Sequence, residues 1–195
     1  MLMLSLVALA TLVANGARQL RFTAIAFLGV SLAAHLLGGP ESSLAQVAVA
    51  ACAALVCAAV LFIAARDARY GEDPGWRLWI ATVVAAAATA GAFAFLRTTA
   101  TEEVRLTVLG NDPSGVTQEA AAFWLLSSGI AILLTARGAV RGSLGALLML
   151  TGAELLVELA PGPQMAFTLL LAWLQVVVAL CGAFLILNER AVREA

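Results

Sequence analysis

The sequence predicts an all-α membrane protein, a polytopic bundle of about seven transmembrane helices with the N-terminus outside and the C-terminus inside. Three observations lead to this prediction: 63% of the 195 residues are hydrophobic, only 12% are charged, and the mean hydropathy is +0.99. A soluble domain is about half apolar and about a quarter charged. The composition therefore excludes a soluble enzyme, a disordered chain and a nucleic-acid binder with a basic face.

Seven apolar segments are separated by connections that carry charged or turn-forming residues. A helix needs about 20 apolar residues to cross a bilayer core. Three segments reach that length, and polar residues at the ends of the other four can extend them into the headgroups. The predicted spans are Leu2–Ala14, Phe22–Leu37, Leu44–Ala65, Leu78–Leu96, Ala120–Thr135, Leu144–Ala160 and Met165–Leu187.

The first apolar segment has two interpretations. A cleaved signal peptide has a basic region before its apolar core and a small-residue cleavage site after it. Here no charge precedes Arg18, and the charges follow the apolar run. We therefore expect a retained helix, with a cleaved or mis-started segment as the alternative.

The arginines predict the orientation. All 11 basic residues are Arg, and alternate connections hold nine of them on one side and only Arg97 and Arg105 on the other. Because cytoplasmic loops carry the excess of basic residues, the side with nine arginines is predicted to be cytoplasmic. This alternation requires an odd number of spans, and a count of six would break it.

The longest connection, 97–119, is predicted to be an external loop. It divides the chain into an N-terminal four-helix part, 1–96, and a C-terminal three-helix part, 120–195. Residues 104–109 alternate as a short strand does, and residues 110–115 have turn chemistry. We expect a small external flap, with a binding loop as the alternative.

Motifs for metals and cofactors are absent from the sequence. The three cysteines lie inside predicted spans and are interpreted as small apolar fillers. The chain has no CxxC, no His–Cys cluster and no GxxxxGK[ST] loop. We therefore expect no metal, no cofactor and no catalytic centre in this chain.

Two carboxylates lie inside a predicted span, where ionisable groups are costly and are candidates for function. Glu154 and Glu158 in TGAELLVELAPGPQ are four residues apart and share one helix face. Glu154 is ten residues past Leu144, about 15 Å along the helix and near mid-membrane. A carboxyl there without a cation should often be protonated. Glu154 is either a proton relay, a neutral acid bonded to a neighbouring helix or a contact to a partner chain; Glu158 could relay or face water at the outer mouth.

Two further polar residues lie at membrane depth. Gln175 lies in the middle of the last span, where an amide usually joins helices and can also hold a water. His35 lies near the outer end of the second span and is either a satisfied interfacial residue or a proton switch.

Other polar and small residues are given structural roles. Ser127 and Ser128 are expected to bond back to carbonyls of their own helix. The tryptophans near span ends, Trp76, Trp79 and Trp124, are expected to lie in the interfacial belt, and Trp173 is expected to lie deeper and to pack on a partner. Small-residue faces that allow close helix approach include Gly142, Gly145 and Gly152.

The last three spans follow a characteristic order: an apolar helix, ARGAVRG inside, GALLMLTGAELLVELA with acids in mid-helix, and a long helix ending LILNERAVRE. This order resembles subunit K of respiratory complex I and its three-helix relative in the multisubunit Na⁺/H⁺ antiporters. With NGARQLRFTAIAFLGVSLAAHLL and VLFIAARD earlier, the seven spans resemble component E of group-4 hydrogenase complexes. The sequence departs from the family in three places. The second-helix acid is at Glu154, one turn after the family's position near Leu150; the last-helix acid is matched by Gln175; and the third span, ACAALVCAAV, lacks the frequent lysine.

The resemblance implies a non-redox subunit of a complex I-like or group-4 hydrogenase assembly that translocates protons or Na⁺ across a bacterial or archaeal cytoplasmic membrane. Its partners would be antiporter-like chains and the membrane chains of a quinone or hydrogenase module. Glu154, Glu158, Gln175 and His35 are the relay candidates. The alternative is a small-solute transporter acting alone, although the halves show no clear repeat. An intramembrane enzyme is disfavoured because the chain has a single histidine.

Overall fold

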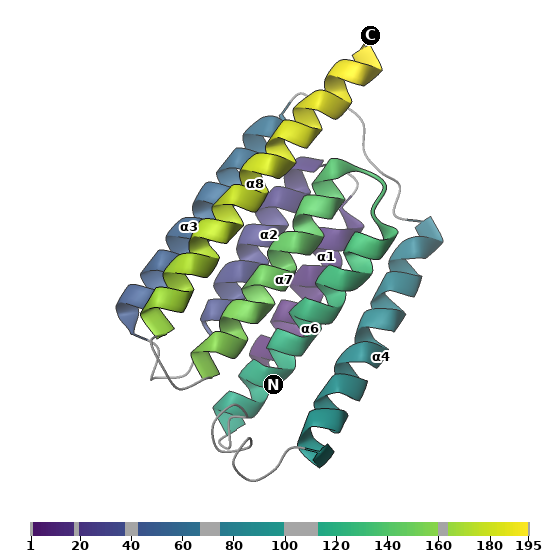
Figure 1. Ribbon diagram of the computed structural model, residues 1–195. Coiled ribbons are helices and arrows are strands. Elements are labelled where there is room, and N and C mark those ends of the chain that lie inside the picture. Colours follow the sequence, from purple (N-terminus) through teal and green to yellow (C-terminus); the bar gives the residue numbers. More distant parts are fainter. Residues whose placement is uncertain are drawn as a thin grey trace.

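The computed structural model describes residues 2–17, 20–37, 43–66, 75–99, 113–159 and 164–194. Within these ranges the regular elements are all α-helices, and they form one bundle (Figure 1). In chain order the helices are α1 (Leu2–Gly16), α2 (Leu20–His35), α3 (Leu44–Ala64), α4 (Gly75–Thr99), α6 (Pro113–Thr135), α7 (Ala139–Leu159) and α8 (Gln164–Glu194).

Five of these helices, α3, α4, α6, α7 and α8, are long and apolar enough to cross a membrane. The helices α1 and α2 are also apolar but have only 15 and 16 residues. The prediction of an all-helical, multi-pass membrane protein is therefore confirmed in this coarser form.

The helices pack around α7. Figure 1 shows that consecutive helices run in opposite directions, so the two chain termini lie at opposite ends of the bundle. α7 packs between α6 and α8 and also contacts α2, while α3 packs along α8 and α4 lies at the edge against α6. Helices from both predicted parts of the chain thus share one bundle, and residues of α7 face three neighbours.

Arginine positions gather at one end of the bundle. α2, α4 and α7 begin at this end, and α3, α6 and α8 finish there (Figure 1). Arg97, in the last turn of α4, lies at the opposite end. We call the two ends the arginine-rich end and the arginine-poor end. The described arginines at the first are Arg21, Arg66, Arg77, Arg137, Arg141, Arg190 and Arg193.

The structure corrects the boundaries of the predicted external loop. α4 continues through Thr99, and α6 begins at Pro113, so both ends of the 97–119 segment are helical. Proline is favoured at the first helical position because its missing N–H has no partner there anyway, so Pro113 starts a helix where a turn was predicted. The strand predicted at 104–109 lies outside the described residues.

Two charged residues assigned to that loop form a partly buried ion pair. Arg97 Nη2 donates to Glu119 Oε2, and Glu119 is fully buried. The Arg97 guanidinium also lies 5.2 Å from the centroid of the Phe93 ring. The pair joins α4 to α6 near the arginine-poor end, because a buried carboxylate requires a partner that compensates its lost hydration.

Glycines allow α6 and α7 to approach closely. A Cβ atom on Gly145 would lie 2.8 Å from the carbonyl oxygen of Gly129 and 2.9 Å from Leu133 Cγ. A Cβ atom on Gly152 would lie 2.9 Å from the carbonyl oxygen of Ala122. The close approach predicted for Gly145 and Gly152 is therefore confirmed, and it brings the side chains of α6 within reach of α7. The same prediction is wrong for Gly142, where an added Cβ atom meets nothing within 4 Å.

We expect Gly145→Ala to lower the free energy of unfolding by about 1–3 kcal/mol, because the methyl group would overpack the contact between α6 and α7. The matched control is Gly91→Ala in α4, where an added Cβ meets nothing within 4 Å. That change should be neutral or stabilise by up to about 1 kcal/mol, since alanine favours helix. Unfolding in detergent measures both, and equal effects would contradict the close packing.

Candidate functional site

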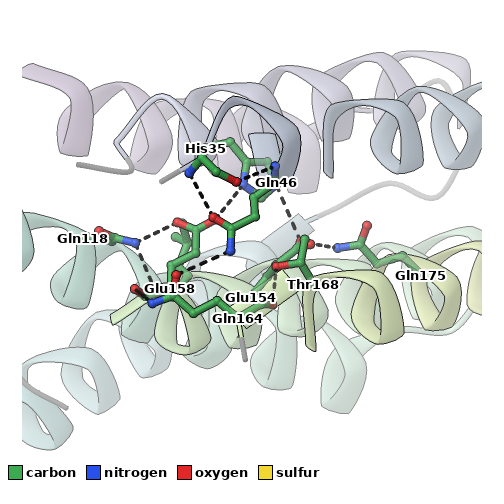
Figure 2. Close-up of polar contacts among 10 residues, drawn as sticks. His35, Gln46, Gln118, Glu154, Glu158, Gln164, Thr168 and Gln175 are labelled. Atoms are coloured by element: carbon green, nitrogen blue, oxygen red, sulfur yellow. Dashed lines mark hydrogen bonds and ion pairs between the residues drawn. The ribbon is translucent and has the colours of Figure 1, made fainter. Parts of the chain in front are cut away.

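The four residues singled out in the sequence meet in one buried cluster. His35 ends α2, Glu154 and Glu158 lie one turn apart on α7, and Gln175 lies in α8 (Figure 2). His35 Nε2 is 3.6 Å from Glu154 Oε2, and His35 Nδ1 is 3.6 Å from Glu158 Oε1. One imidazole therefore lies between two carboxyl groups.

Each carboxyl group also accepts a hydrogen bond from a glutamine amide. Gln175 Nε2 donates to Glu154 Oε2 over 2.9 Å, and Gln118 Nε2 donates to Glu158 Oε2 over 2.9 Å. Gln118 Nε2 lies 3.3 Å from the Leu155 carbonyl oxygen as well. These contacts connect α7 to α8 on one side and to α6 on the other.

The cluster is enclosed by the protein. Glu154 and Gln175 have no exposed surface, His35 is 3% exposed, and the side chain of Glu158 is 5% exposed. Glu158 therefore does not face water at the outer mouth, which was one of its two interpretations. His35 is buried against carboxylates and is not an interfacial residue with its own hydrogen bonds.

The hydrogen-bond inventory of the cluster is short of donors. Both imidazole nitrogens, Glu154 Oε1 and Gln175 Oε1 are buried, and none has a hydrogen-bond partner among the described residues. The 3.6 Å contacts are longer than a hydrogen bond, which spans about 2.7–3.2 Å for N–H···O. Ser31 Oγ, one turn before His35 on α2, is also buried without a partner there. A proton on the imidazole or on a carboxyl group supplies a missing donor, so this arrangement can bind protons.

Three glutamines complete the cluster, and sequence reasoning did not select them. Besides Gln118, they are Gln46 in the first turn of α3 and Gln164 at the start of α8. Gln46 Nε2 donates to Gln164 Oε1 over 3.4 Å, and Gln164 Nε2 donates to the Glu158 carbonyl oxygen over 3.2 Å (Figure 2). The available signal was their shared location, since all three lie in the first two turns of helices that start at the end where α2 finishes.

Local capping explains the position of Gln46. Ser43 is the N-cap of α3, and its Oγ accepts from the Gln46 N–H over 3.2 Å. In return the Ser43 N–H donates to Gln46 Oε1 over 3.0 Å, which completes a capping box. The box fixes the side chain so that its remaining amide group points to Gln164.

The cluster runs from the arginine-poor end toward the middle of the bundle. Gln175 is 11 residues into α8, about 16 Å from its start. Beyond it, toward the arginine-rich end, fully buried side chains on α7 and α8 include Leu147, Leu148 and Ala179. Thr151 is buried there too, but its hydroxyl donates to the Leu147 carbonyl of its own helix. The side-chain hydrogen bonds of the cluster therefore stop near Gln175, about half-way through.

The chain gives no match in comparisons with protein-family models, with curated proteins and with solved structures. Among the residues that the structure describes, no three His, Cys, Asp or Glu side chains are grouped so that they could hold a metal ion. What the cluster can do therefore follows from its own titratable groups.

We expect His35→Asn to destabilise the protein, because it removes the imidazole that lies between two buried carboxyl groups. Adding Glu158→Gln should restore part of the loss, with a coupling of about 0.5–3 kcal/mol in a double-mutant cycle. Denaturant unfolding in detergent measures the four free energies.

The control pair combines His35→Asn with Glu189→Gln. Glu189 lies near the arginine-rich end, where its carboxylate accepts from the Ala139 N–H over 3.3 Å. These two changes should be additive, because the residues share no contact. Additivity in both cycles would show that His35 and Glu158 do not interact.

Proposed function

We propose that the chain is a non-redox membrane subunit of a complex I-like or group-4 hydrogenase assembly, and that its His35–Glu154–Glu158 cluster exchanges protons there. The observation that carries the proposal is a pair of carboxyl groups on one helix face, held at one imidazole inside the bundle. The resemblance of the last three spans to subunit K supports the same assignment.

Electrostatics favour a proton-binding role for the cluster. Two ionised carboxylates without hydration are costly in an apolar bundle, and a single added proton removes one charge or creates an ion pair. Glu154, His35 and Glu158 are three titratable groups in contact, so a proton on one can be passed to the next by small side-chain rotations. A series of this kind is what a relay requires.

The distribution of arginines supports an orientation for the relay. Seven described arginine positions lie at the arginine-rich end, and by the positive-inside rule such an end is expected in the cytoplasm. With seven crossing helices the N-terminus is then outside, the C-terminus inside, and the cluster lies in the outer half of the bundle. The short helices α1 and α2 fit a thinned bilayer or a place among longer neighbours.

The outer surface supports a place among other membrane chains. Only 12% of the membrane-length apolar stretch of α4 is buried within the protein. Trp79 and Val83 on this helix are 72% and 64% exposed. Such faces suit lipid and helices of partner chains. In the proposed assembly the partners are antiporter-like chains and membrane chains of a quinone or hydrogenase module.

We expect Glu154→Gln to leave assembly intact and to lower coupled ion movement by at least about tenfold, since positioned acid–base groups commonly contribute about 10²–10⁴-fold. Glutamine keeps the shape and can still bond to Gln175, but it cannot titrate. The measurement is proton uptake by liposomes that contain the complex purified through a tagged copy of this chain. Glu189→Gln is the matched control and should move protons at the parental rate.

Three outcomes would contradict the proposal. One is a parental rate for Glu154→Gln in an assembled complex, which would make the residue a hydrogen-bonding group. Another is purification without other membrane proteins of the assembly. A third is a stable, isolated chain that transports a solute in liposomes, which would favour the transporter alternative.

The orientation has its own test by cysteine labelling in intact cells and in inverted vesicles. After replacement of the three native cysteines, Leu36→Cys at the arginine-poor end should react from outside. Gly138→Cys, between α6 and α7, should react only from the cytoplasmic side. Reaction of both from the same side would exclude the proposed topology.

A further inference from the structure

We propose that a small cavity between α1, α4 and α6 binds one water molecule, which accepts a hydrogen bond from Trp124 and bonds to Ser128. The site lies apart from the His35 cluster and does not depend on the proposed function. Its walls come from Thr11 and Asn15 on α1, Thr82 and Ala85 on α4, and Trp124 and Ser128 on α6.

The size of the cavity fits a single water molecule. Its volume, counted as the space open to the centre of a water-sized sphere, is about 10 Å³. A cavity needs roughly 10–15 Å³ by this measure to hold one water. Larger ligands such as a carboxylate or a phosphate do not fit this volume.

Two buried polar groups that line the cavity lack a partner among the described residues. Ser128 is 5% exposed, and its Oγ makes no hydrogen bond, although the sequence predicts that it bonds back to its own helix. The Nε1 atom of Trp124 is also buried without a partner. Trp124 packs against apolar clusters on both sides, so it does not lie in an interfacial belt as predicted. A buried donor left unbonded costs about 1–3 kcal/mol.

Hydrogen-bond chemistry selects water as the occupant. An indole N–H can only donate, so Trp124 needs an acceptor, whereas a hydroxyl can donate and accept. Thr11 Oγ1 already donates to the Val7 carbonyl over 2.7 Å, which leaves its lone pairs available to a donor. Water can accept from Trp124 and donate to the Ser128 and Thr11 oxygens, and three partners are typical of buried water.

The cavity lies toward the arginine-rich end. Thr11 and Asn15 lie in the last two turns of α1, which finishes at that end, and Ser128 lies in the second half of α6. The His35 cluster occupies the other half of the bundle. α6 therefore contributes polar groups to both sites: Gln118 to the His35 cluster and Ser128 to the cavity.

Trp124 provides a direct spectroscopic test. Trp76, Trp79 and Trp173 are 63–72% exposed, and replacing them with Phe leaves Trp124 as the single indole of the full chain. Ultraviolet resonance Raman spectra in detergent should then show a hydrogen-bonded indole N–H that exchanges in D₂O. An unbonded N–H in this protein would show that the cavity is dry and would overturn the proposal.

Two cavity-filling variants distinguish water from another acceptor. Ser128→Val and Ala85→Val add methyl groups from opposite walls and should each shift the indole N–H to the unbonded band. The two changes lie on different helices. If one variant fails to fold, the other still tests whether water is the acceptor of the Trp124 N–H. Ser127→Val, one residue away and not lining the cavity, is the matched control and should leave the bonded band unchanged. A bonded band that persists in the folded filling variants would overturn the proposal.

Discussion

The pair of carboxyl groups on α7 is the constraint around which the bundle is arranged. Helices in lipid gain little from burying apolar surface against each other, so close packing and polar contacts decide which of them associate. Glu154 and Glu158 accept from Gln175 on α8 and Gln118 on α6, and both face His35 on α2. The close approach of α6 to α7 at the glycines brings Gln118 on α6 within hydrogen-bonding distance of Glu158 on α7.

The sequence predicts the helices and the four central residues because both depend on local signals. Apolar length marks each span, and Glu154, Glu158, His35 and Gln175 stand out because they are polar at membrane depth. The other three glutamines of the cluster were not selected, because an amide in the first two turns of a helix has the same local pattern whether it faces headgroups or the protein interior.

Contacts between distant segments could not be predicted in this way. Hydropathy does not encode that α3 packs along α8, or that Arg97 and Glu119 face each other across the ends of two helices. Both charges were therefore assigned to an external loop, and Pro113 was assigned to a turn although it begins α6. The surroundings of Ser128 and Trp124 could not be predicted either, because their polar groups are enclosed only by the packing of α1 and α4 on α6.

The ion pair between α4 and α6 has a consequence for biogenesis. Arg97 precedes Glu119 by 22 residues, so the end of α4 leaves the ribosome before the carboxylate that pairs with it. A long basic side chain can keep its charged head in water at the membrane interface while its stem lies along apolar surface. The final position of the Arg97 guanidinium therefore depends on a helix that is inserted later.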